Sequence, residues 1–107
     1  MALDSLSSRD RQVALFEAYG TLLTRHQREV LDLYLRRDWS LSEIARTQAT
    51  SRSAVHDLIR RAASSMEEYE RRLGLVSERG RRRSELARLS EQLGTLKRRV
   101  DAMGSNA

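Results

Sequence analysis

The chain has 107 residues, of which 39% are hydrophobic and 33% are charged, with a formal net charge of +5 and neither proline nor cysteine. This length suits one domain with an appendage, and the lack of cysteine excludes disulfides, thiolate metal sites and cysteine nucleophiles. Helix formers dominate, so the composition predicts an all-helical fold. The longest apolar run, residues 13–16, is too short to span a membrane, and the N-terminus lacks the basic start of a signal peptide. We therefore expect a cytoplasmic protein with no membrane span.

The first two helices follow from apolar spacing and capping signals. A first helix is predicted over about residues 8–19, with Gly20 at its C-terminal end and an apolar face formed by Val13, Phe16 and Tyr19. Thr24 and Gln27 have the spacing of a capping box, so a second helix starts at Thr24. Two apolar pairs share one side of this helix, Val30 with Leu31 and Tyr34 with Leu35.

A helix-turn-helix is predicted over residues 40–62. Ser40 and Glu43 form a second capping box, and Trp39 with Ile44 occupies the hydrophobic-staple positions around it, so a third helix starts there. Ser51 is the expected N-cap of a fourth helix. This helix carries an apolar stripe that extends well past the helix-turn-helix, formed by Val55, Ile59, Ala62, Met66, Tyr69 and Leu73.

The last third of the chain holds the excess positive charge and a separate apolar stripe. Residues 1–70 carry ten Arg against eleven acids, whereas residues 71–107 carry ten Arg and Lys against four acids. The stripe of the fourth helix fails at RGRRR, residues 79–83. A new stripe follows in the a and d positions of a short heptad seam, formed by Leu86, Leu89, Leu93, Leu96, Val100 and Met103.

Residues 23–62, LTRHQREVLDLYLRRDWSLSEIARTQATSRSAVHDLIRRA, resemble the fourth region of bacterial sigma factors. The resemblance implies a helix-turn-helix with a core of Val30, Leu31, Leu41, Ile44, Ala45, Val55 and Ile59. It also implies that one face of the second helix is directed to the major groove of DNA, through Arg52, Ser53, His56, Asp57 and Arg60.

A second resemblance reaches further along the chain and is more specific. LFEAYGTLLT at residues 15–24, DWSLSEIA, SRSAVHDLIRR and EEYERRLGL at residues 67–75 together resemble the YlxM-like family. These are small helix-turn-helix proteins usually encoded beside signal recognition particle genes. The resemblance implies a partner in that particle, either its protein or its RNA. We expect a sigma-region-four-like helix-turn-helix domain over residues 1–75 and a basic helical tail over residues 76–107.

Two segments are candidates for binding nucleic acid. On the predicted recognition helix, Arg52, Ser53, His56, Arg60 and Arg61 can reach bases or phosphates, but Asp57 and nearby acids oppose their charge. That helix either reads DNA or is only structural or protein-docking. In the tail, Arg79, Arg81, Arg82 and Arg83, with Arg71, Arg72, Lys97, Arg98 and Arg99, form a cluster that suits non-specific phosphate binding. The alternative is a solvated, positively charged tail.

The turn between the two helices departs from DNA-binding sigma domains. Those proteins usually have Gly and then an apolar residue in the turn, whereas this chain has Ala49 and Thr50. Because only Gly adopts left-handed backbone freely, we expect Ala49 to avoid it.

No enzyme, metal site or cofactor is predicted. Ser53, His56 and Asp57 are neighbours on one exposed helix face without oxyanion donors. His26 and His56 lie on different helices and lack a third ligand.

The heptad seam either pairs between chains or folds back, and we expect it to form a homodimer. Three functions remain: an accessory or regulatory protein of the signal recognition particle pathway, a transcription regulator, and a structural dimerisation module. The position of the positive charge favours the first.

Overall fold

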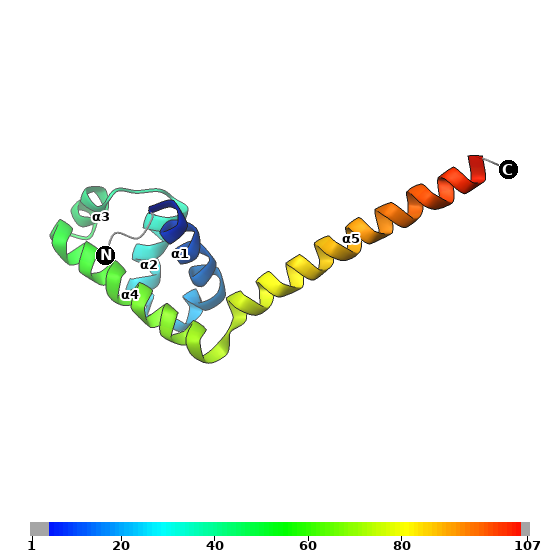
Figure 1. Cartoon of the computed structure of the whole chain (residues 1–107). Coiled ribbons are helices and arrows are strands. Elements are labelled where there is room, and N and C mark those ends of the chain that lie inside the picture. Colours follow the sequence, from blue (N-terminus) through cyan, green and yellow to red (C-terminus); the bar gives the residue numbers. More distant parts are fainter. Residues whose placement is uncertain (1–4, 106–107) are drawn as a thin grey trace. The chain divides into compact units, whose positions relative to one another are not determined.

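The described part of the chain, residues 5–105 of the computed structural model, is almost entirely helical (Figure 1). Its elements are α1 (Ser5–Tyr19), the 3-10 turn η1 (Gly20–Leu22), α2 (Arg25–Leu31), the π-helical turn η2 (Asp32–Arg36), α3 (Leu41–Thr47), α4 (Arg52–Leu73) and α5 (Leu75–Ser105). No strand occurs within these residues, so the all-helical prediction is confirmed. No helix in the same range is both long enough and apolar enough to cross a membrane.

The chain divides into two compact units, Met1–Val76 and Ser77–Ala107. The first unit contains α1 to α4 together with Leu75 and Val76, the first two residues of α5. The second unit contains the remainder of α5. The two units have different compositions, because the excess of Arg and Lys lies in the second.

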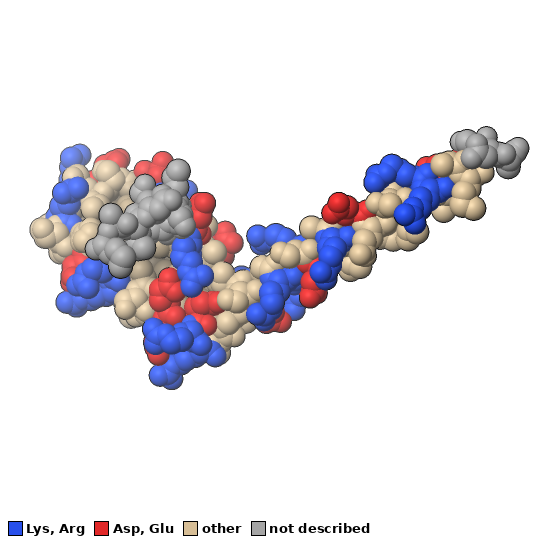
Figure 2. Space-filling view, in the orientation of Figure 1, with Lys and Arg blue, Asp and Glu red and all other residues tan. Residues whose placement is uncertain are grey.

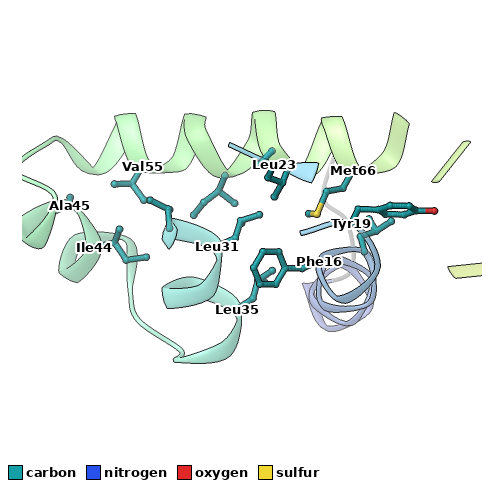
Figure 3. Close-up of a cluster of buried hydrophobic side chains, with 13 residues drawn as sticks. Phe16, Tyr19, Leu23, Leu31, Leu35, Ile44, Ala45, Val55 and Met66 are labelled. Carbon is teal, nitrogen blue, oxygen red and sulfur yellow. The ribbon is translucent and has the colours of Figure 1, made fainter. Parts of the chain in front are cut away.

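One hydrophobic core holds the first unit together, and α1 to α4 all contribute to it (Figure 3). The resemblance to sigma factors implied most of this core correctly, since Val30, Leu31, Ile44, Ala45, Val55 and Ile59 are all buried. Leu41 is only half-buried at the edge. Leu15 and Leu23 are also buried, although no sequence pattern had singled them out.

The helix starts predicted from capping signals are confirmed. Thr24 with Gln27, and Ser40 with Glu43, form reciprocal capping boxes in which each side chain accepts the other residue's amide hydrogen. The Ser51 hydroxyl accepts the amide of Ala54 at 3.0 Å and caps α4. These bonds satisfy amide groups that the first turn of a helix leaves unpaired. The capping residues therefore set where α2, α3 and α4 begin.

The first helix differs from its prediction at both ends. It begins at Ser5 rather than residue 8, and Gly20 does not cap it in the left-handed conformation. Instead, Gly20 is buried and opens the 3-10 turn η1. A Cβ at this position would lie 3.0 Å from Cε1 of Phe16, which is tighter than most Cβ contacts in proteins. Gly20 therefore leaves room for the Phe16 ring, and its backbone is not left-handed.

The predicted stripe of α4 is correct as far as Tyr69 and wrong at Leu73, which is 57% exposed. Gly74 adopts a left-handed φ of 65° and ends α4, with its amide donating to the carbonyl oxygen of Glu70 at 2.8 Å. The chain turns there, and Leu75 and Val76 pack against the core. The sequence pattern did not place this break.

A buried polar network joins α1, α4 and the first turn of α5. Glu70 is only 7% exposed, and its Oε1 accepts hydrogen bonds from the Tyr19 hydroxyl at 2.6 Å and the Val76 amide at 3.0 Å. The Tyr19 hydroxyl oxygen accepts the amide of Leu75 at 3.0 Å. Both amides belong to the first turn of α5, where a helix lacks internal acceptors. Glu70 and Tyr19 therefore cap α5 from outside that helix.

Candidate nucleic-acid interfaces

The helix-turn-helix is formed by α3, the turn Gln48–Ser51 and α4. The turn closes α3 through two hydrogen bonds: the Ala49 amide donates to the Arg46 carbonyl at 3.4 Å, and the Thr50 amide donates to the Ala45 carbonyl at 3.0 Å. This pairing is a Schellman motif, which requires a left-handed residue after the last helical position. Ala49 supplies it with a φ of 54°. The expectation that Ala49 avoids left-handed backbone is therefore wrong, because the turn requires this conformation from whichever residue stands there.

Replacing Ala49 with Gly should stabilise the protein by about 1 kcal/mol. Left-handed backbone costs an L-residue about 1–2 kcal/mol, and the extra freedom of Gly in the unfolded chain returns part of the gain. The midpoint temperature of thermal unfolding should rise by about 4–8 °C. Ala63, inside α4, is the matched control, because Gly there should lower stability by about 1 kcal/mol. A decrease in stability for A49G would show that the turn does not strain Ala49.

The first two turns of α4 present the predicted recognition face. Arg52, Ser53 and His56 are exposed and line a shallow hollow of about 620 Å³ with Asp57 and Leu41. Arg52 forms no ion pair with any residue of the described chain. The structure therefore brings three of the predicted base-reading side chains together on one solvent-facing surface.

Asp57 lies among the arginines of that face and pairs with two of them. Its Oδ1 lies 2.6 Å from Nη2 of Arg60, and its Oδ2 lies 3.0 Å from Nε of Arg61. The hydrogen bond from Arg60 is the main reason why the pKa of the Asp57 carboxyl lies below its usual range. Asp57 is therefore ionised at neutral pH and opposes both arginines. A DNA phosphate would have to displace this carboxylate to reach either one.

Replacing Asp57 with Asn should increase the affinity of the protein for random-sequence duplex DNA. The change removes one negative charge and releases Arg60 and Arg61, so the log–log salt slope should steepen by about 1–2. Asp32 is the matched control, because it pairs with Arg36 and Arg37 away from this face. D32N should have a much smaller effect in the same anisotropy titration. Equal effects of the two changes would mean that only net charge matters.

The arginines of the first unit are mostly neutralised by neighbouring acids. Nine of them form ion pairs: Arg9, Arg11, Arg25, Arg36, Arg37, Arg60, Arg61, Arg71 and Arg72. Arg71 and Arg72 had been grouped with the tail cluster. Both instead contact Glu68, and the bond from Arg72 is the main reason why the pKa of Glu68 lies below its usual range. The first unit therefore presents little unpaired positive charge.

The second unit presents positive charge that is largely unpaired. Arg and Lys side chains recur along α5 (Figure 2). Within residues 77–105, Arg82 pairs with Glu78 at 3.0 Å. The remaining cations of this segment form no ion pair in the described chain: Arg79, Arg81, Arg83, Arg88, Lys97, Arg98 and Arg99. Of the two candidate interfaces, α5 therefore carries the stronger positive field.

The sequence model of the family described as "UPF0122: Putative helix-turn-helix protein, YlxM / p13 like" matches residues 6–104. The chain belongs to this family. A UPF0122 protein of Symbiobacterium thermophilum is 48% identical over 83 residues, which is 78% of each chain. One from Clostridium kluyveri is 46% identical over 74 residues, covering 69% of this chain and 67% of its own. One from Geobacillus kaustophilus is 43% identical over 79 residues, covering 74% and 72%.

In the part of this UPF0122 protein that the structure describes, Ser53, His56 and Asp57 are not linked as a catalytic relay. In the described chain the Asp57 oxygens contact Arg60 and Arg61, and no hydrogen bond joins Asp57 to His56. A serine–histidine–aspartate relay needs that bond. No group of three His, Cys, Asp or Glu side chains within the described residues is placed to hold a metal ion.

The ion pairs of Asp57 with Arg60 and Arg61 were not predicted from the sequence, although the spacing of these residues indicates them. Asp57 precedes Arg60 by three residues and Arg61 by four, and these spacings bring side chains together on a helix. Arg88 was also left out of the tail cluster, although it lies seven residues after Arg81 and shares its face of α5. The Tyr19–Glu70 network has no such local signal.

Proposed function

We propose that this UPF0122 protein is an accessory protein of the signal recognition particle pathway and that it binds the RNA of the particle through α5. In this proposal the α3–α4 unit has the shape of a DNA reader but does not read a sequence. The observation that carries it is the distribution of charge. Unpaired arginines line α5, whereas Arg60 and Arg61 on the recognition helix are paired with Asp57.

The binding mode follows from the electrostatics of polyanions. Each phosphate neutralised by a cation releases a counterion, so a dense arginine segment binds without base contacts. Arg79, Arg81 and Arg83 lie within five consecutive residues and have no ion pair in the described chain. No aromatic side chain lies among them to stack on bases. We therefore expect binding that depends on phosphate and RNA shape more than on base identity.

The pathway itself is supported by the resemblance to YlxM-like proteins, which are usually encoded beside signal recognition particle genes. Neither the fold nor the charge distribution selects one RNA over another. The pathway and the binding mode are therefore separate parts of the proposal, and each needs its own readout.

Co-purification from a native lysate tests both parts. Full-length tagged protein is recovered with and without nuclease treatment, and the bound RNA, DNA and proteins are identified. We expect the particle RNA to be enriched and to be lost after ribonuclease treatment. Retention of a particle protein after ribonuclease treatment would instead support protein docking. Enrichment of genomic DNA would contradict the proposal.

A DNA-binding transcription regulator is the second candidate, favoured by the exposed and unpaired Arg52 beside Ser53 and His56. The free energy available for base discrimination is too small to favour this function. One bidentate contact discriminates by about 1–3 kcal/mol, whereas specific recognition needs about 4–10 kcal/mol over non-specific binding. Selection from random duplexes should yield no motif. A motif that is lost in R52A would make the regulator the better account.

A further inference from the structure

One face of α5 carries an apolar stripe of exposed side chains. Its members are between 53% and 72% exposed, and they are Leu86, Leu89, Leu93, Leu96, Val100 and Met103. Large apolar side chains that line up on one face of a helix indicate an interaction surface. We propose that this seam pairs with the same seam of a second copy of the chain and that the two helices run antiparallel. The inference does not depend on the proposed function.

A second copy is favoured because the first unit offers no matching apolar surface. Among the described residues of that unit, only Leu22 and Leu73 are large apolar side chains with high exposure. Two side chains cannot cover a stripe of six. A partner helix with the same a and d pattern can cover all of them by inserting knobs into holes.

The seam is self-complementary when the two helices run antiparallel. Its spacings of three, four, three, four and three residues read the same from either end. Leu86 then lies against the partner's Met103, Leu89 against the partner's Val100, and Leu93 against the partner's Leu96. Every a position thus meets a d position, and no apolar side chain is left without a neighbour.

Charge selects the antiparallel orientation over the parallel one. Arg79 and Arg82 occupy the a and d positions just before the seam, so parallel helices would bring each against the partner's identical arginine. Like charges at such close range are repulsive. Antiparallel helices would separate the two Arg82 residues by about 38 Å along the axis, at 1.5 Å per residue.

The mass of the full chain tests whether the pair forms. Light scattering should give twice the 12.3 kDa of one chain. Replacing Leu93 and Leu96 with Glu should halve the measured mass. The matched control replaces Ala87 and Ala102 with Glu, since both lie on the opposite face of α5, and it should remain dimeric. A monomeric full-length chain, or a dimer that survives L93E/L96E, would overturn the proposal.

The lack of cysteine makes the orientation directly measurable by spin labelling. Single cysteines replace Ser84 and Thr95, which both face away from the seam, and each variant is labelled. In an antiparallel pair centred between Gly94 and Thr95, the labels at position 95 lie close together. Those at position 84 are offset by about 32 Å along the axis. Similar distances at both positions would show a parallel pair and overturn the antiparallel assignment.

Discussion

Replacing Arg79, Arg81, Arg82 and Arg83 with Ala should lower the affinity of the protein for RNA by about a hundredfold at moderate salt. Three of these side chains have no ion pair in the described chain, and the fourth contacts Glu78. Losing up to four phosphate contacts should reduce the magnitude of the log–log salt slope by about 3. The loss should be similar for all RNA sequences, because phosphates carry no base identity. Fluorescence anisotropy at several salt concentrations gives both the affinity and the slope.

The matched control removes the same amount of charge from the helix-turn-helix. Arg46, Arg52, Arg60 and Arg61 are replaced with Ala, which changes the formal charge by the same amount. This variant should bind RNA within a few fold of the unmodified protein, because Arg60 and Arg61 are already neutralised by Asp57. If the two variants lose affinity equally, binding follows net charge and α5 has no special role.

Replacing Tyr19 with Phe should reduce the free energy of unfolding by about 2–3 kcal/mol. The hydroxyl donates to the buried Glu70 carboxylate at 2.6 Å and accepts the Leu75 amide at 3.0 Å, and Phe makes neither bond. Each hydrogen bond contributes about 0.5–1.5 kcal/mol, or about 1.5–3 kcal/mol where one partner is charged, and the Leu75 amide left without its acceptor adds a penalty. The midpoint temperature of thermal unfolding should fall by about 10 °C or more.

Tyr34 provides the matched control for this change. The guanidinium carbon of Arg9 lies 5.2 Å from the centre of the Tyr34 ring, and Arg9 also donates a hydrogen bond to the Tyr34 backbone carbonyl. A phenylalanine at this position preserves both interactions. Y34F should therefore alter stability by no more than about 0.5 kcal/mol. A Y19F protein as stable as Y34F would mean that the network to α5 contributes nothing. Hydrogen exchange at Leu75 and Val76 gives a local readout of the same network, and it should be faster in Y19F.

The sequence predicted those parts of the fold that depend on local signals. Thr24, Ser40 and Ser51 were placed correctly because a cap and the amide it binds lie three residues apart. The core positions of α2 to α4 followed from helical periodicity and from the resemblance to sigma factors. The predictions that failed concern local packing and turn closure, which residue spacing alone does not show. Ala49 is left-handed because the turn closes α3, and Gly20 leaves room for the Phe16 ring.

The candidate interfaces were predicted in part. The recognition face and the tail arginines were identified from charge and helical phase. The balance between them depends on pairs that only the structure shows, namely Asp57 with Arg60 and Arg61, and Glu68 with Arg71 and Arg72. The Tyr19–Glu70 contact joins residues that are 51 positions apart and has no periodic signal.

Cross-linking the full-length protein to RNA in a native lysate tests the central claim most directly. Ultraviolet light joins bound RNA to the side chains that touch it, and digestion followed by mass spectrometry identifies the linked peptide. We expect linked peptides from residues 77–105 of α5, joined to signal recognition particle RNA. Linked peptides confined to residues 52–62 of the recognition helix would contradict it.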